Sequence, residues 1–169
     1  MTLDPHVWPA GARRTDDGAI AVAGVDLRDL AAEHGTPVYV LDEADFRARA
    51  RGIREAFEQA FAPLGTGVDV YYAGKAFLCV AVARWAHEEG LRIDTATGGE
   101  LAVALRAGVP GADIGLHGNN KADDEIGRAL RQLVDGRRFP RRSAEAPVGA
   151  AERGLRHRGD EFARRFVGH

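Results

Sequence analysis

A strand-like run followed by a helical pattern recurs three times in the middle of the chain. Residues 68–73, 91–96 and 112–116 are β-branched and apolar runs, and apolar residues at helical spacing follow each of them. Strands that alternate with helices predict a parallel sheet, because parallel neighbours need a crossover connection. The periodicity leaves two architectures open, a doubly wound sheet and a (β/α)8 barrel.

The first third of the chain predicts further elements with clear start and stop signals. Asp26 and Asp42 are good N-caps, and Gly35 is a typical helix end. The second helix has Phe46, Ala50, Ile53, Phe57 and Ala60 at helical spacing, so these residues are expected to share one apolar face. The expected elements are a strand at 19–25, a helix at 27–34, a strand at 38–41 and a helix at 43–62.

Composition excludes several classes of protein. The formal charge of −2 gives no protein-wide attraction to nucleic acid or to anionic membranes. The one cysteine, Cys79, rules out an intrachain disulfide, and no apolar run approaches the roughly 20 residues that span a bilayer. The start of the chain also lacks the pattern of a signal peptide. A cytoplasmic protein is expected, without a nucleic-acid or membrane partner.

The C-terminal part differs from the rest. Residues 131–169 contain ten of the arginines and little sustained periodicity. We expect residues 135–169 to be a disordered tail, or the product of a frameshift. Two other interpretations are a nucleic-acid-binding arm, which the acids and the lack of interleaved aromatic residues disfavour, and a partly helical docking segment.

Polar side chains follow all three predicted strands at their carboxyl ends. The segments are Tyr71-Tyr72-Ala73-Gly74-Lys75-Ala76, Asp94-Thr95-Ala96-Thr97-Gly98-Gly99-Glu100 and His117-Gly118-Asn119-Asn120-Lys121. The carboxyl ends of parallel strands lie at one edge of the sheet, and chemistry in such folds collects there. The three segments are therefore expected to face one rim.

Lys75 is the candidate nucleophile at this rim. The 23 basic residues are 21 arginines and only two lysines, Lys75 and Lys121, so a lysine here is more often than usual present for its amine. Between an apolar strand and an apolar helix, Lys75 is expected to be partly desolvated, which favours a nucleophilic amine. The structural alternative is a lysine at a helix start whose stem covers apolar surface.

The other two strand ends offer candidates with structural alternatives. Asp94 either balances a protonated amine or caps a turn, and His117 and Asn119 either serve a site or are structural. Thr97 and Glu100 fit a capping box at a helix start. There is no metal-ligand cluster, Walker loop, dinucleotide fingerprint or hydrolase serine elbow. The remaining chemistry is the kind that a lysine starts.

Together the three segments resemble diaminopimelate decarboxylases, which belong to the alanine-racemase-like class of pyridoxal-phosphate enzymes. The Tyr-Ala-x-Lys-Ala signature of that family matches residues 72–76, and its Asp-x-Ala-Ser-Gly-Gly-Glu segment matches residues 94–100 with Thr97 in place of serine. His117 to Lys121 matches a stretch that marks the diaminopimelate branch over its ornithine and arginine relatives. The segment that leads into the repeating pattern, Gly35 to Val40, also resembles that family.

The resemblance implies a fold and a set of roles. The fold is a partial (β/α)8 TIM barrel of the alanine-racemase-like type, ending after three or four βα units, with residues 36–134 as the pyridoxal-phosphate-binding part. Residues 1–35 join a β domain in the full-length family. Lys75 is the catalytic, cofactor-bearing lysine, with Asp94, His117 and Asn119 as further cofactor-binding residues.

The resemblance also implies the reaction and its limits. The family removes carbon dioxide from meso-diaminopimelate to give L-lysine, as a homodimer. Such a barrel needs about 250 residues, and the family's later cofactor-binding residues are not matched here, so the chain is expected to be an incomplete and inactive fragment. The alternatives are a related ornithine or arginine decarboxylase and a non-enzymatic binding module.

Overall fold

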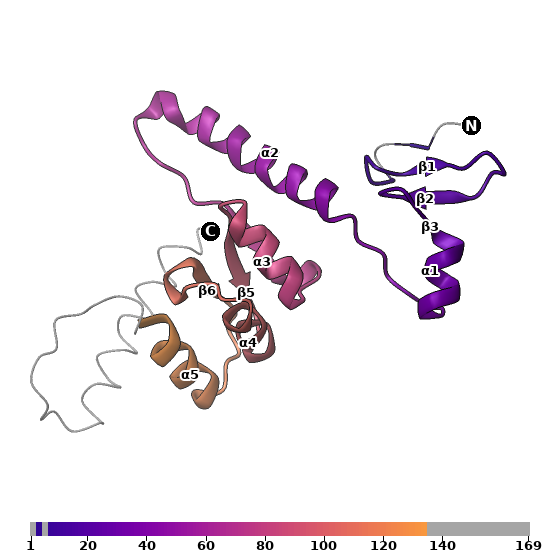
Figure 1. The fold of residues 1–169 in the computed structure, drawn as a ribbon. Helices are drawn as coiled ribbons and strands as arrows, with labels where there is room; N and C mark the ends of the chain where they lie inside the picture. The colour runs from indigo at the N-terminus through magenta and orange to yellow at the C-terminus, as the bar shows by residue number, and fades with distance from the viewer. Residues whose placement is uncertain (1–2, 5–6, 135–169) are drawn as a thin grey trace, which may run out of the picture. The chain divides into compact units, whose positions relative to one another are not determined.

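The parallel sheet predicted from the repeating pattern is present as three strands (Figure 1). The computed structural model describes residues 3–4 and 7–134, so the expected tail at 135–169 lies outside the described residues. The strands are β4 (Tyr71–Ala73), β5 (Arg92–Thr95) and β6 (Ile114–Leu116), which pair in parallel in that order. Each is shorter than its apolar run, because the strand includes only those residues that pair with a neighbour.

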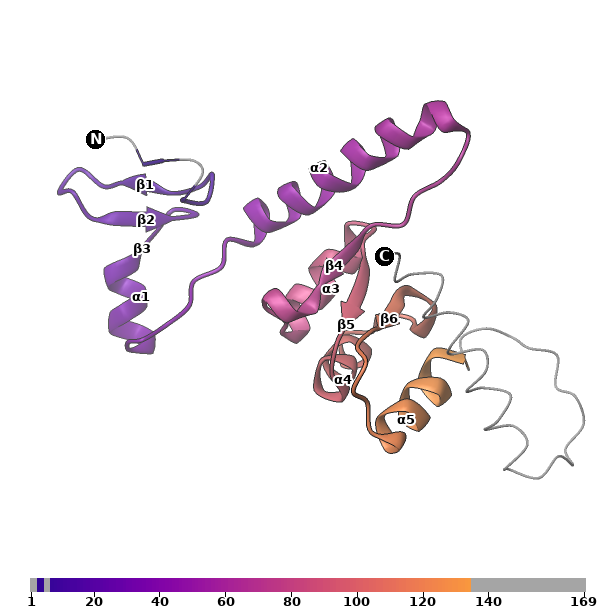
Figure 2. The ribbon, with the colours of Figure 1, turned by 180° about the vertical axis from the view of Figure 1, so that it is seen from behind.

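A helix follows each of these strands. The helices are α3 (Val80–Glu88), α4 (Gly98–Arg106) and α5 (Asp123–Val134), and short 3-10 turns at η2 (Gly74–Ala76) and η3 (Gly111–Asp113) complete the connections. The first turn of α5 contains Asp123, Asp124 and Glu125, and Arg131 lies in its last turn. This charge order matches the helix dipole. Figure 2 shows β4, β5 and β6 side by side from behind.

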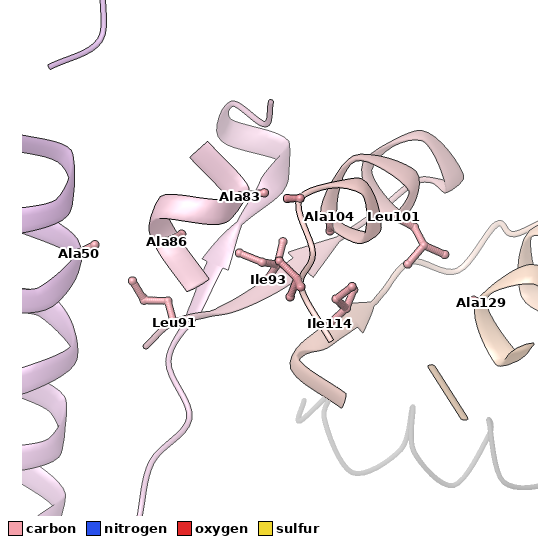
Figure 3. Close-up of a cluster of buried hydrophobic side chains, with 11 residues drawn as sticks. Ala50, Ala83, Ala86, Leu91, Ile93, Leu101, Ala104, Ile114 and Ala129 are labelled. Atoms are coloured by element: carbon pink, nitrogen blue, oxygen red, sulfur yellow. The ribbon is translucent and has the colours of Figure 1, made fainter. Parts of the chain in front are cut away.

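The strand order and the position of the helices can be compared with the two architectures left open by the sequence. The order β4-β5-β6 follows the chain without the reversal that marks a doubly wound sheet. Ile93 on β5 packs with alanines of both α3 and α4, so both helices cover the same face of the sheet (Figure 3). Consecutive parallel strands with α3 and α4 on one face fit a (β/α)8 barrel, and they also fit one half of a doubly wound sheet.

The core between the sheet and these helices is made largely of small residues. Ile93 and Leu101 are its largest fully buried apolar side chains. Alanines lie opposite them and let the helices approach the strands closely, which gives the dense packing typical of protein interiors. These alanines are Ala83, Ala86 and Ala104, each with no exposed surface.

The long helix α2 (Glu43–Phe61) begins where it was predicted. The carboxylate of its N-cap, Asp42, accepts a hydrogen bond from the Asp45 amide. The predicted apolar face is only half right. Phe46 packs edge-on against Tyr72 and Ala50 joins the core, but Ile53 and Phe57 are 52% and 48% exposed. Helical spacing aligns these side chains, but in the described residues the packing partners extend only along the first part of the helix.

An ion-pair network also holds α2 against α3. The Arg47 guanidinium lies 2.6 Å from a Glu88 oxygen and 3.3 Å from a Glu89 oxygen, and it also pairs with Glu43 one turn earlier. The carboxylates raise the pKa of Arg47 above its ordinary value, with the hydrogen bond to Glu88 as the largest cause. The network fixes α2 where Phe46 reaches Tyr72, directly before the turn that contains Lys75.

The N-terminal part forms a small antiparallel sheet of β1 (Arg13–Arg14), β2 (Ile20–Val22) and β3 (Val25–Asp26), followed by α1 (Leu27–His34). The helix bounds, the Asp26 cap and the stop at Gly35 are as predicted. The single strand expected at 19–25 is instead two strands. Ala23 and Gly24 both have positive φ, and two such residues form the tight turn of a hairpin.

The strand predicted at residues 38–41 is wrong. These residues have no strand partner within the described part of the chain, and all four are exposed, Tyr39 by 92%. β-Branched and aromatic residues favour strands only where they pack against neighbours, so propensity alone did not decide this segment.

The described residues belong to one compact unit. The domain boundary expected at residue 35 stays a prediction. No helix of the described residues is both long enough and apolar enough to cross a bilayer.

Candidate active site

The carboxyl ends of the three parallel strands bring the predicted segments to one edge of the sheet. Ala73, Asp94 and Gly115 are aligned across β4, β5 and β6. Side chains alternate along a strand, so the core contains Ile93 and Thr95 while Asp94 points to the opposite face. The face away from the helices therefore contains the polar residues, as the inside of a (β/α)8 barrel does at its catalytic end.

Lys75 lies in the 3-10 turn η2, directly after β4. A close approach of backbones fixes this turn, because a Cβ on Gly74 would lie 2.8 Å from the Asp94 carbonyl oxygen. The Tyr72 hydroxyl donates a 2.6 Å hydrogen bond to the Phe77 carbonyl, which spans the turn. Burial, and to a lesser degree Cys79, raise the pKa of Tyr72 above its ordinary value. The turn is thus anchored on both sides of Lys75.

The expectation that Lys75 is partly desolvated is wrong for this structure, in which the residue is exposed. Within the described residues the amine has no hydrogen bond or ion pair. The strand and helix that flank Lys75 are apolar, but their buried side chains face the core between the sheet and the helices and do not cover the lysine. An amine without a carboxylate partner is available to react with an electrophile, whereas the amine of a lysine in a surface ion pair is already engaged.

Asp94 and His117 form a close pair at the same edge. Asp94 Oδ1 lies 2.6 Å from His117 Nδ1. An ionised carboxylate can only accept, so Nδ1–H of His117 donates to it and leaves Nε2 directed away from Asp94. The His117 amide also donates to the Thr95 carbonyl at 2.9 Å. The structure therefore brings together two residues that the sequence predicted separately.

The segment after β5 is a helix start, as the capping box predicted. The Thr97 hydroxyl accepts from the Glu100 amide at 3.1 Å, and a Glu100 carboxylate oxygen accepts from the Ala96 amide at 2.7 Å. The reach-back bond goes to the residue before the N-cap and not to the N-cap itself. These two residues therefore act structurally, by fixing the loop that follows Asp94.

Asn119 is the predicted site residue that the structure does not bring to the others. It is exposed, and its side chain makes no hydrogen bond within the described residues. It lies in the same loop as His117, two residues farther on. Its predicted role in binding the cofactor stays a prediction.

Sequence reasoning missed three residues that shape this edge. The Thr95 hydroxyl donates to the Gly115 carbonyl at 2.7 Å and is fully buried between β5 and β6. Lys121 Nζ donates to the Ala96 carbonyl at 2.5 Å, and Glu125 accepts from the Gly98 amide at 3.0 Å. The scarcity of lysine was a usable signal for Lys121. A glutamate in the first turn of a helix is too common to single out Glu125.

The side chains of this edge fit one end of a pyridoxal phosphate group. An aldehyde needs an unpaired amine, which Lys75 provides within the described residues, and the Asp94 carboxylate lies on the neighbouring strand. The first amide of α4 is already bonded to Glu125, so this helix start does not offer that amide to a phosphate. No group of three or more His, Cys, Asp or Glu side chains in residues 3–4 and 7–134 could hold a metal ion.

Comparisons with known proteins agree with this geometry. Residues 45–139 match the family model "Pyridoxal-dependent decarboxylase, pyridoxal binding domain". A diaminopimelate decarboxylase of Mycobacterium tuberculosis is 50% identical over 134 residues, which are 79% of this chain and 28% of that protein. One from Bacillus subtilis is 43% identical over 123 residues, covering 73% of this chain and 27% of that protein.

A solved structure is also similar. The diaminopimelate decarboxylase from M. jannaschii, crystallised in complex with L-lysine, matches with a TM-score of 0.65 and 30% sequence identity. The match covers 73% of this chain and 28% of that one. The chain therefore spans roughly a quarter of the length of the relatives it matches.

Proposed function

The chain belongs to the pyridoxal-dependent decarboxylases through the pyridoxal binding domain of that family, and from this premise we propose that Lys75 bears the cofactor in decarboxylation of meso-diaminopimelate. The observation that supports the role of Lys75 is its place directly after β4, without a hydrogen bond or ion pair to the described residues and next to Gly74, which approaches the Asp94 backbone. Asp94 and His117 occupy the corresponding ends of β5 and β6, so three predicted site residues share one edge of the sheet.

Bound pyridoxal phosphate supplies an electron sink that accepts the bonding electrons when carbon dioxide leaves the amino acid. In the proposed reaction meso-diaminopimelate loses carbon dioxide and gains a proton at the same carbon, which gives L-lysine. The residues of this chain have narrower tasks. The Lys75 amine attaches the cofactor, and the negative charge of Asp94 favours protonated nitrogen close to it.

The proposed role of His117 is to exchange protons at Nε2, the ring nitrogen that is not bonded to Asp94. Its Nδ1–H donates to Asp94, which fixes the ring plane and leaves Nε2 as the open position. A ring that is held on one side by a carboxylate presents its other nitrogen in a defined direction. We propose that this nitrogen and the Asn119 amide face the cofactor when it is bound.

The choice of meso-diaminopimelate over ornithine or arginine rests on the relatives. Proteins named diaminopimelate decarboxylase match at 42–53% identity, and the segment from His117 to Lys121 is the one expected to mark that branch. We further propose a homodimer in the cytoplasm for the whole protein. The single cysteine is consistent with a reducing compartment.

We also infer that the 169-residue chain turns over its substrate slowly or not at all by itself. Lys75 is exposed, and desolvation is one of the means by which a lysine amine becomes a good nucleophile. A decarboxylation assay of the purified chain with added cofactor tests this directly. Turnover in the ordinary enzymatic range, about 1–10³ per second, overturns the inference.

Covalent labelling tests the role of Lys75. The purified chain is mixed with pyridoxal phosphate, reduced with borohydride and digested, and the modified peptide is located by mass. We expect the label on Lys75, with Lys121 and the N-terminal amine unmodified, and we expect Lys75→Arg to abolish it. Labelling spread over the three amines, or labelling that persists in the variant, rejects Lys75 as the cofactor lysine.

Substrate class is tested by adding amino acids to the labelled but unreduced chain. The absorbance of the bound cofactor is followed during titration with meso-diaminopimelate, ornithine and arginine. A change at the lowest concentration with meso-diaminopimelate supports the proposal. A stronger response to ornithine or arginine identifies the related branch instead.

A further inference from the structure

The loop from His117 to Ala122 is bonded to almost every residue at the end of β5. The His117 ring contacts Asp94, its amide donates to the Thr95 carbonyl, and Lys121 donates to the Ala96 carbonyl. Glu125, which follows the loop in the first turn of α5, accepts from Gly98. Four of the five residues from 94 to 98 are therefore bonded to this loop or to Glu125. A loop that only connected a strand to a helix would not need so many bonds.

Lys121 makes the middle bond of this series. Its ammonium lies 2.5 Å from the Ala96 carbonyl oxygen and would lie 2.5 Å from a Cβ on Gly118. Gly118 has φ +115, which is a conformation that favours glycine. The missing side chain of Gly118 therefore leaves the space that the Lys121 amine occupies. A compact ammonium fits this space, whereas the planar guanidinium that this chain otherwise uses for positive charge is larger.

Glu125 makes the last bond and joins two helix starts. One carboxylate oxygen accepts from the Gly98 amide at 3.0 Å, and the other accepts from the Ala122 amide at 3.2 Å. Gly98 is the first residue of α4, and Ala122 directly precedes α5. Negative charge is favoured at both positions by the helix dipoles. The hydrogen bond from Gly98, followed by that from Ala122, lowers the pKa of Glu125 below its ordinary value.

We propose that Lys121 and Glu125 are positioning residues that together form a clasp between the β5–α4 and β6–α5 loops. The clasp holds the loop of His117 against the end of β5, so that the His117 ring stays on Asp94 beside the Lys75 turn. This inference rests on the proposed function, because its consequence is the correct placement of the residues around the cofactor.

The test compares Lys121→Met and Glu125→Gln with two matched controls. Arg84→Met removes one positive charge from an exposed residue of α3 that makes no ion pair in the described residues. Asp124→Asn removes a carboxylate next to Glu125 that makes no bond to either loop. All four variants and the parent chain are compared by amide spectra, so that a variant that fails to fold is recognised and the other clasp variant is used.

Three readouts are taken. Hydrogen exchange of the Gly98 amide reports the Glu125 bond, nitrogen chemical shifts of His117 report which ring nitrogen holds the hydrogen, and titration gives the dissociation constant for pyridoxal phosphate. In both clasp variants we expect a mixture of ring tautomers and a dissociation constant about three- to tenfold higher, the effect of one lost hydrogen bond. Faster exchange of Gly98 is expected in Glu125→Gln. The controls should match the parent chain.

Failure of this inference and failure of the proposed function give different results. If Gly98 exchange rises while the His117 shifts and the dissociation constant stay at parent values, the clasp is structural only and the inference is rejected. If the parent chain is not labelled at Lys75, the proposed function is rejected, and the His117 shifts alone then decide whether the clasp positions the ring.

Discussion

Asp94 Oδ1 lies 2.6 Å from His117 Nδ1, across two neighbouring parallel strands and 23 residues apart in the chain. A second His–Asp pair joins α3 to the 3-10 turn that precedes β6, where His87 Nε2 lies 3.1 Å from Asp113 Oδ2. Only the first pair lies at the edge that contains Lys75. The two pairs have the same chemistry but different places in the fold, so each is a control for the other.

The first prediction concerns Asp94→Ala. Loss of the acceptor frees the His117 ring, so its nitrogen shifts should no longer report a single Nδ1–H tautomer, and borohydride-fixed labelling of Lys75 should fall severalfold. The pair is partly exposed, so the free energy of unfolding should fall by less than about 1 kcal/mol. Asp113→Ala should leave the labelling of Lys75 unchanged. Equal loss of labelling in both variants contradicts a specific role for Asp94.

The second prediction concerns Gly74→Ala. The added Cβ would lie 2.8 Å from the Asp94 backbone carbonyl oxygen, which has little room to give, and 3.2 Å from a Leu78 side-chain carbon. Overpacking of this kind costs about 1–3 kcal/mol of unfolding free energy, which urea denaturation measures.

Gly52→Ala is the matched control for Gly74→Ala. Gly52 lies within α2, and a Cβ there meets no other atom within 4 Å. Replacing a glycine within a helix by alanine should raise stability by about 0.5–1 kcal/mol. The two alanine substitutions are therefore expected to have opposite signs. A stabilising Gly74→Ala change shows that the turn has room the structure does not indicate.

The third prediction concerns Thr95→Val, which keeps the shape of the side chain but removes its hydroxyl. Thr95 is fully buried, and its hydroxyl donates to the Gly115 carbonyl. Loss of this donor should lower the free energy of unfolding by about 1–2 kcal/mol. Thr66→Val is the control, because Thr66 is exposed and its bond to the Gly67 carbonyl is long, at 3.3 Å. It should change stability by less than about 0.5 kcal/mol.

The fourth prediction is a dependence on pH through Glu125. Its folded-state pKa is lowered, first by the Gly98 hydrogen bond, so the folded state binds the proton less readily than the unfolded chain does. The resulting stabilisation is complete above the ordinary glutamate pKa of about 4.3 and is lost as pH falls through the lower folded-state value. Acid titration should therefore show that the protection of the Gly98 amide, relative to its intrinsic exchange rate at each pH, falls below about pH 4. In Glu125→Gln that fall should be absent, and its persistence assigns the transition to another carboxylate.

The sequence determined the local elements wherever a start or stop signal coincided with helical spacing. Asp26 and Asp42 cap their helices as expected, and Gly35 ends the first of them. Thr97 and Glu100 fix the start of α4 through their capping bonds. These features involve residues within four positions of each other, so neighbours along the chain are sufficient to specify them.

The segments around Lys75, Asp94 and His117 were also visible in the sequence, because parallel strands place their carboxyl ends at one edge. Periodicity alone did not decide the fold class. The order β4-β5-β6 and the packing of Ala83 and Ala104 on the same side of Ile93 fit both architectures, and the similarity to a solved diaminopimelate decarboxylase supports the barrel. Strand order and helix side are relationships between distant segments.

Only the tertiary structure decided which side chains pair or become buried. Val38 to Leu41 have strong strand propensity but no partner, and Ile53 and Phe57 have helical spacing but no cover in the described residues. The Asp94–His117 pair and the two bonds of Lys121 and Glu125 to the end of β5 likewise join residues 23 to 27 positions apart. Local sequence specifies backbone geometry, whereas burial and pairing depend on what the rest of the chain brings alongside.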